Sequence, residues 1–191
     1  VGMATRGKDI EDLTVKFLRA VFEKMGYQVL NVRKQLAGAQ NGFDVRVSFL
    51  DESELPREIL FECKDYSSSV EWAKIVDKIL QIHASAYNPD AFIVLSPKTK
   101  VSNIVANSWE AVRKTVKFPI KIWDTDAKIE EIFGVVPDVY KEIYDKDVDR
   151  EFDSGKMIIK LKSLIRGLIN EKSTMHIVQK IIIKDSKKNP K

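Results

Sequence analysis

Residues 42–64 read GFDVRVSFLDESELPREILFECK, and this stretch decides the fold around which the rest of the chain is built. Apolar and polar side chains alternate from Phe43 to Phe49, which is the period of a β-strand with one buried face. The acidic segment DESELPRE is typical of a turn, and EILFECKDY alternates again as a second strand. We expect the two strands to pair antiparallel as a hairpin.

Helices and further strands are expected on both sides of this hairpin. Residues 9–25 place apolar side chains at helical spacing and end before Gly26, a residue that suits the position just after a helix. A short strand, YQVLNV, follows. After the hairpin we expect a helix over about 70–87, a buried strand AFIVLS, a helix in SNIVANSWEAVRKTV, a strand FPIKIWD and a short helix over 126–133. This order predicts an α/β fold with a mixed central sheet flanked by helices.

The composition indicates a globular protein, because 44% of the residues are apolar and 31% are charged. No apolar run is long enough for a membrane span, and the N-terminus lacks the apolar segment of a signal peptide. The single cysteine excludes an intramolecular disulfide and indicates a reducing, cytoplasmic compartment. With only two histidines, the usual zinc ligands are too few, so a zinc site is disfavoured.

Three segments are predicted from patterning and charge: an α/β domain over 1–135, a polar linker over 136–155, and a basic helical extension over 156–191. The extension holds ten basic and two acidic side chains, whereas the preceding residues hold 22 basic and 26 acidic ones. Within it, KMIIKLKSLIRGLI and MHIVQKIIIK are short amphipathic pieces. A solvated helical face, a contact with nucleic acid, and a connector to a further domain of a longer polypeptide all fit this charge.

The chemistry of the hairpin is concentrated in Asp44, Glu62 and Lys64. Side chains alternate along a strand, so Glu62 and Lys64 share one face and Cys63 points to the other. If the strands pair, the carboxylates of Asp44 and Glu62 converge, and with a backbone carbonyl, which we assign to Cys63, they offer the oxygen ligands that Mg²⁺ prefers. A lysine beside such an ion can orient or deprotonate a water molecule that attacks a phosphodiester. The alternative is an exposed cross-strand ion pair of Glu62 and Lys64.

A family resemblance rests on these residues in their order. The segment GFD ends at Asp44, ECK follows at 62–64, a helix with Glu11 precedes them, and a helix and the strand AFIVLS come after. Residues 7–125 therefore resemble the PD-(D/E)xK nuclease superfamily, and in particular its Mrr-like restriction endonuclease branch. Gly42-Phe43 stand where the superfamily name has proline, a departure that many members share.

The resemblance implies a restriction-endonuclease-like core and specific roles. Asp44 and Glu62 would be ligands of Mg²⁺ or Mn²⁺, and Lys64 would be the catalytic lysine. Glu11 would be an additional acid that approaches the metal directly or through water. Asp12 is a substitute for it, and a plain surface charge is the alternative interpretation of Glu11.

Further candidate residues flank the motif. Gln81 lies on the helix after it, where related nucleases place a polar residue that faces the site, and a solvated helix face is its alternative interpretation. Tyr66 and Ser67 follow Lys64 and would contact a phosphate or cap the next helix. The candidate contacts to nucleic acid are Arg33, Lys34, Tyr66, Ser67, Lys74 and Lys78. For Lys74 and Lys78 a solvated helix face is the alternative interpretation.

Together these features predict a Mg²⁺-dependent DNA endonuclease. Double-strand cleavage needs two active sites, so a homodimer is expected. By analogy with similar domains, the chain would serve as an effector of a bacterial defence or restriction protein. Two alternatives stay open: a non-catalytic nucleic-acid-binding or oligomerisation module on the same fold, and a nuclease specific for RNA or for DNA junctions.

Overall fold

The central sheet is mixed, as the sequence predicts. The computed structural model describes residues 3–35, 42–64 and 70–188. Within these ranges one sheet has the strand order β1-β2-β3-β5-β7. The strands are β1 (Gln28–Lys34), β2 (Val45–Leu50), β3 (Pro56–Cys63), β5 (Ala91–Leu95) and β7 (Ile120–Trp123). Neighbouring strands from β1 to β3 pair antiparallel, whereas β5 pairs parallel with β3, and β7 pairs parallel with β5.

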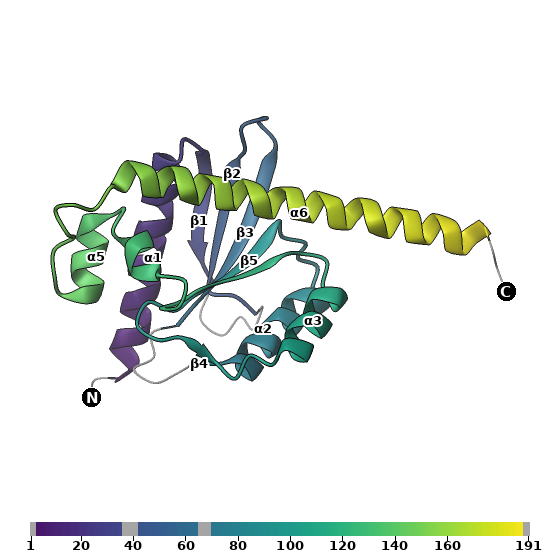
Figure 1. Cartoon of the computed structure of the whole chain (residues 1–191), viewed down its shortest axis with the longest axis horizontal. Coiled ribbons are helices and arrows are strands. Elements are labelled where there is room, and N and C mark those ends of the chain that lie inside the picture. Colours follow the sequence, from purple (N-terminus) through teal and green to yellow (C-terminus); the bar gives the residue numbers. More distant parts are fainter. Residues whose placement is uncertain (1–2, 36–41, 65–69, 189–191) are drawn as a thin grey trace.

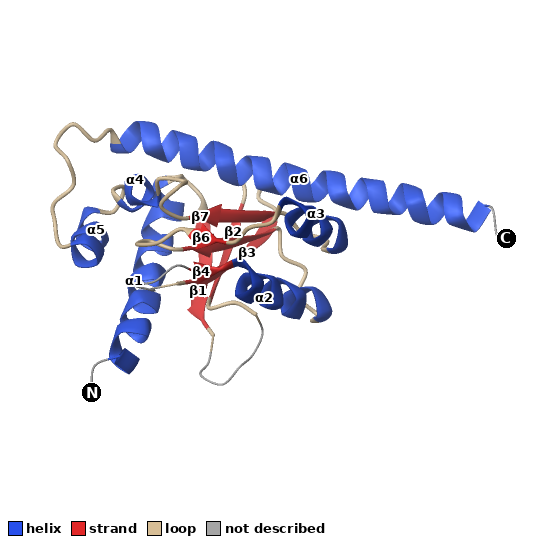
Figure 2. Ribbon diagram, turned by 60° about the horizontal axis from the view of Figure 1, so that its bottom comes forward, coloured by secondary structure: helices blue, strands red, loops and turns tan. Residues whose placement is uncertain are grey.

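Helices cover both faces of the sheet (Figures 1 and 2). Side chains of one hydrophobic cluster come from α1 (Met3–Lys24), α4 (Ile129–Phe133), α5 (Pro137–Tyr144) and α6 (Ser154–Lys188). Those of a second cluster, on the other face, come from α2 (Trp72–Ala84) and α3 (Ala106–Thr115). Two short strands, β4 (Val70–Glu71) and β6 (Val101–Ser102), pair parallel beside them. None of the described helices combines the length and the apolar character needed to cross a membrane.

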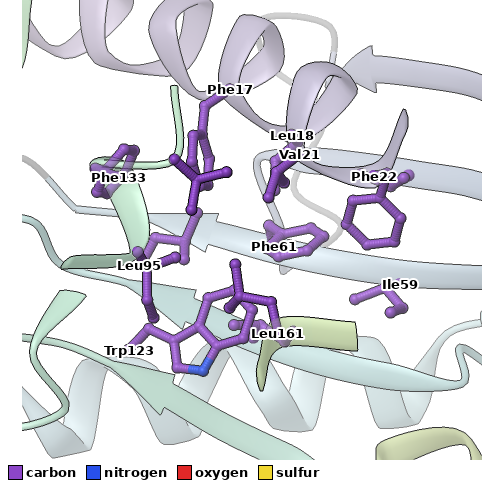
Figure 3. Close-up of a cluster of buried hydrophobic side chains, with 14 of the residues drawn as sticks. Phe17, Leu18, Val21, Phe22, Ile59, Phe61, Leu95, Trp123, Phe133 and Leu161 are labelled. Atoms are coloured by element: carbon purple, nitrogen blue, oxygen red, sulfur yellow. The ribbon is translucent and has the colours of Figure 1, made fainter. Parts of the chain in front are cut away.

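The first cluster fixes α1 against the sheet (Figure 3). Apolar side chains recur at helical spacing on α1 and form one buried stripe, which is the amphipathic pattern seen in the sequence. This stripe packs on Phe61 and on residues of the neighbouring strands. The four residues of the stripe labelled in Figure 3 are Phe17, Leu18, Val21 and Phe22.

β3 and β5 are buried on both faces, which explains their continuous apolar runs. Along β3, Ile59 and Phe61 join the first cluster, while Leu60 joins the second. By the same alternation Glu62 faces the side of the sheet that α2 covers. The apolar segment AFIVLS is thus confirmed as an interior strand.

Two helix starts differ from the sequence prediction. The helix expected from about residue 70 begins at Trp72, and the one expected from about residue 102 begins at Ala106. Val70–Glu71 and Val101–Ser102 instead form the β4–β6 ladder, in which Val70 pairs with Val101, and residues 103–105 connect β6 to α3. Local helical periodicity could not reveal this ladder, because each of its strands is only two residues long.

Phe43 also departs from its expected place. It was expected on the face of Val45 and Val47, but it packs in the second cluster, with its ring centroid 5.1 Å from that of Tyr87. The reason is that β2 begins only at Val45 and that Gly42, just before Phe43, has φ of +82°. The strand alternation therefore does not extend back to Phe43.

The segment expected as a linker, 136–155, contains helix α5. Three of its side chains, Val139, Tyr140 and Ile143, are buried in the first cluster. The division of the chain into a nuclease-like domain, a linker and an extension stays a prediction.

The basic C-terminal segment is helical, as expected, and its two amphipathic pieces belong to one continuous helix. Helix α6 spans 35 residues and crosses the sheet before it runs past it (Figure 1). The residues between the two expected pieces, 170–174, contain neither glycine nor proline, so nothing interrupts the helix. Lys162 and Arg166 pair with Glu52 in the turn between β2 and β3, which anchors α6 at that end of the hairpin.

A buried lysine provides a second anchor for α6. The side chain of Lys172 is 4% exposed, and its Nζ donates hydrogen bonds to Asn88 Oδ1 and to the Lys117 carbonyl. Asn88 precedes β5 and Lys117 precedes β7, so one ammonium group links the helix to the entrances of two strands. Burial lowers the pKa of Lys172.

Replacing Lys172 with methionine should destabilise the fold. The variant Lys172→Met leaves the acceptors of Asn88 and Lys117 without their donor, and an unpaired buried polar group costs about 1–3 kcal/mol. We expect the free energy of unfolding in urea to fall by that amount. The matched control is Lys180→Met, at an exposed position of the same helix, which should change it by less than about 0.5 kcal/mol. Equal stability of the two variants would contradict the anchoring role.

Candidate active site

Asp44 lies directly before β2 and is held against β3 by its backbone and by its carboxylate. Its N–H donates to the Phe61 carbonyl at 2.8 Å, and its Oδ2 accepts a hydrogen bond from the Cys63 N–H at 2.7 Å. The antiparallel register pairs Val45 with Phe61, which places Asp44 level with Glu62 on the neighbouring strand. The structure therefore brings the two acids together.

Glu62 is a carboxylate inside the protein. Its side chain is 0% exposed, and its Oε1 forms an ion pair with Lys64 Nζ. Beyond this ion pair, neither carboxylate oxygen has a hydrogen-bond partner of good geometry among the described residues. Burial, and after it the negative charge of Asp44, raises the pKa of Glu62 to about 7, while Lys64 acts in the opposite direction. The pair is thus buried, unlike the exposed ion pair of the alternative interpretation.

Glu11 of α1 reaches the same group electrostatically. Burial raises the pKa of Glu11, and the negative charge of Asp44 raises it further, whereas Lys34 and Lys64 lower it. The neighbouring Asp12 is engaged elsewhere, because it forms an ion pair with Lys34. The geometry favours Glu11 over Asp12 as the acid that faces the site, and its role as a metal ligand stays a prediction.

The donor set fits a hard divalent cation. Carboxylate and carbonyl oxygens are the ligands of Mg²⁺, and apart from the ion pair with Lys64 the oxygens of Glu62 have no donor within the described part of the chain. The thiol of Cys63 belongs to the first cluster, and burial raises its pKa well above the ordinary value, so only the backbone carbonyl of Cys63 suits such an ion. In the described ranges no three His, Cys, Asp or Glu side chains are grouped closely enough to hold a metal by themselves. An ion at Asp44 and Glu62 would keep water ligands.

Helix α2 packs tightly on the loop that leads into Asp44. A Cβ atom placed on Gly42 would lie 2.4 Å from the Lys78 carbonyl and 3.1 Å from the Gln81 Cβ. Gly42 also has φ of +82°, a conformation that other residues adopt only with strain. Gln81 therefore lies beside the approach to Asp44, and its side chain is exposed. Its catalytic role stays a prediction.

The other candidate contacts to nucleic acid are spread over the surface. Arg33 is exposed on β1, and Lys34 on the same strand is already paired with an acid of α1. Lys74 is exposed on α2. Tyr66 and Ser67 lie outside the described residues.

The family of the chain follows from a comparison with protein families. Residues 8–130 match the model of the Mrr catalytic domain, described as a restriction endonuclease, and the match includes Asp44, Glu62 and Lys64. The chain belongs to this restriction endonuclease family. This confirms the resemblance that the order of its motifs indicates. No curated protein matches the chain at a significant level.

A solved structure with some likeness to this restriction endonuclease domain is that of MspJI restriction endonuclease in complex with a 27-mer oligonucleotide. The two share 13% sequence identity at a TM-score of 0.44. The alignment covers 78% of this chain and 34% of the MspJI chain. The chain thus spans about a third of the length of that protein, and the family assignment rests on the match over residues 8–130.

Two features of the restriction endonuclease domain escaped sequence reasoning. One is the close packing at Gly42, where α2 leaves no room for a side chain. The sequence interpretation of Lys78 as a DNA contact or a solvated helix residue did not include an effect on Glu62, on which its charge acts. Both features depend on how α2 packs against the hairpin. This packing is a tertiary contact that no local sequence pattern indicates.

Substituting Gly42 should disturb the position of Asp44. Gly42→Ala adds a Cβ that overlaps the Lys78 carbonyl and forces an alanine into positive φ, which alone costs about 1–3 kcal/mol. We expect a loss of at least that size in the free energy of unfolding, measured in urea. Gly167→Ala is the matched control, because no atom lies within 4 Å of its added Cβ, and alanine in a helix should be neutral or stabilising. A Gly42→Ala variant as stable as wild type would refute this packing.

The raised pKa of Glu62 predicts a pH-dependent stability. The folded carboxyl titrates at about 7 against an ordinary value of 4.5, so between these values the folded protein binds the additional proton. Stability is therefore lost as the pH rises from about 4.5 to 7. Glu62→Gln removes this titration. In EDTA we expect the variant to gain about 3 kcal/mol relative to wild type between about pH 4 and pH 8, measured by urea unfolding. A constant difference between the two proteins would contradict the shift.

Proposed function

We propose that this domain is an endonuclease that hydrolyses phosphodiester bonds of DNA with Mg²⁺ or Mn²⁺ as cofactor. The observation that supports it best is the meeting of two carboxylates and one ammonium at the same end of β2 and β3. Asp44 is hydrogen-bonded to the backbone of β3 beside Glu62, and Glu62 is paired with Lys64. The family assignment over residues 8–130, to a restriction endonuclease domain, supports the nuclease part of this proposal.

Each residue has a proposed role at the metal. Asp44, Glu62 and the carbonyl of Cys63 would hold the cation, and Glu11 would bind it directly or through water. The bound ion supplies charge neutralisation at the phosphate and a more acidic water molecule. Lys64 would orient or deprotonate that water and offset the charge that develops on the phosphate. Gln81, beside the approach to Asp44, would position water or substrate.

The proposed contacts to the DNA backbone surround this site. They are Arg33, Lys34, Tyr66, Ser67, Lys74 and Lys78. Such contacts place the duplex without reading its sequence. The basic segment over 156–191 is a further candidate, because its positive charge would release counterions from DNA.

The assembly and the biological role are inferred from the chemistry and by analogy. A homodimer would supply the two active sites that double-strand cleavage needs. A role as effector of a bacterial defence or restriction protein follows from family analogy. A cytoplasmic location is proposed from the single reduced cysteine.

Plasmid cleavage tests the proposed function. Wild type should nick or linearise supercoiled plasmid with Mg²⁺ and lose this activity in EDTA. Lys64→Ala should cut at least 10²-fold more slowly, on the order expected for the loss of a general acid–base group. Asp44→Ala should be inactive, because the cation loses a ligand. Lys24→Ala, at an exposed position of α1, is the matched control and should cut like wild type.

The result separates the alternatives. Equal cutting by wild type, Lys64→Ala and Asp44→Ala would eliminate the assignment of the site. Binding of DNA without cleavage under Mg²⁺ or Mn²⁺ would favour the non-catalytic module. Cleavage of RNA or of branched DNA, with plasmid left intact, would keep the site and change the substrate.

A further inference from the structure

Lys78 lies on the part of α2 that packs beside the candidate site. The carbonyl of Lys78 is the atom that a Cβ on Gly42 would meet at 2.4 Å, so this turn of α2 touches the loop that delivers Asp44. α2 covers the face of the sheet toward which Glu62 points. Side chains of a helix lean toward its N-terminus, which for α2 is the end that follows β3 and Lys64.

The ammonium of Lys78 differs from those of Lys64 and Lys34, which form ion pairs. Lys64 is paired with Glu62, and Lys34 is paired with Asp12. Lys78 is half-buried, and it forms neither an ion pair nor a hydrogen bond with another described residue. Its charge still acts on Glu62, because it lowers the pKa of that carboxyl, although burial outweighs it. A partly desolvated cation beside an anionic site is placed to receive an anionic ligand.

We propose that Lys78 is a second catalytic lysine, which contacts a non-bridging oxygen of the scissile phosphate. This inference rests on the proposed function. It places Lys78 at the phosphate that reacts, and not at a neighbouring phosphate of the DNA backbone. Lys64 is paired with Glu62 in the free protein, whereas no ion pair or hydrogen bond engages the Lys78 ammonium among the described residues. Negative charge on the non-bridging oxygens grows in the transition state, so an ammonium at this place stabilises that state more than bound DNA.

Binding and cleavage by two variants test this role. Lys78→Gln removes the charge and keeps a polar side chain, and Lys78→Arg keeps the charge. The matched control is Lys114→Gln, at an exposed position of α3 on the same face of the sheet. The binding probe is a 30-base-pair duplex in Ca²⁺, titrated at several salt concentrations, and the cleavage probe is supercoiled plasmid in Mg²⁺ at saturating enzyme. Thermal unfolding of all variants reports on folding.

The expected results are specific to a phosphate contact. Lys78→Gln should lower the slope of log affinity against log salt by about 0.9, the value for one lost phosphate contact. Its rate of cleavage at saturation should fall on the order of 10²-fold. Lys78→Arg should retain the salt slope and recover most of the rate. Lys114→Gln should match wild type in both measurements.

Other outcomes would overturn the proposal in distinguishable ways. An unchanged salt slope and rate in Lys78→Gln would remove Lys78 from the substrate. A lowered slope with an unchanged rate would make it a flanking backbone contact. A lower melting temperature that accounts for the lost activity, without recovery in Lys78→Arg, would make it a structural partner of Glu62. If wild type binds with a slope that depends on Lys78 and cuts nothing, the proposed function fails while the phosphate contact stands.

Discussion

The structure around the hairpin depends on one unfavourable placement, the burial of the Glu62 carboxylate inside the sheet. A buried charge is costly unless a counter-charge or a proton accompanies it. β3 lies between β2 and β5, so Glu62 has Val94 of β5 on one side and Asp44, just before β2, on the other, and α2 covers its face of the sheet. The ammonium of Lys64 offsets part of the cost, and the raised pKa of Glu62 reflects what is left. A cation bound at the proposed metal site would offset this cost by favouring the charged form of Glu62.

The remainder of the fold holds this arrangement in place. Asp44 is held beside Glu62, because its carboxylate accepts the Cys63 N–H and its own N–H donates to the Phe61 carbonyl. Gly42, two residues before Asp44, has no side chain, so α2 can contact the backbone there. On the opposite side, α1 packs on β3 through its apolar stripe, which places Glu11 within electrostatic reach of Asp44. Helix α6 contacts the far end of the hairpin through the ion pairs of Lys162 and Arg166 with Glu52. Rigid elements thus support the acids from three directions.

Lys78 and Lys64 differ in how far their ammonium groups are available to bind a phosphate. Both lie near Glu62, yet one is held in an ion pair and the other has no such partner in the described chain. In an anionic reaction such as phosphodiester hydrolysis, the amount of positive charge that can shift toward the phosphate limits the stabilisation of the transition state. The packing of α2 decides this availability, because it determines how near the Lys78 side chain lies to the buried acid.

The sequence by itself determined the order of elements, the hairpin and the identity of the acids. Strand alternation and helical spacing are local patterns, so the mixed sheet and the face shared by Glu62 and Lys64 could be predicted from them. Tertiary structure alone decided the depth of Glu62, the contact of α2 with Gly42, the two-residue strands before α2 and α3, and the single helix α6. Burial and strand partners depend on segments far apart in the chain, and no local period encodes how closely those segments approach.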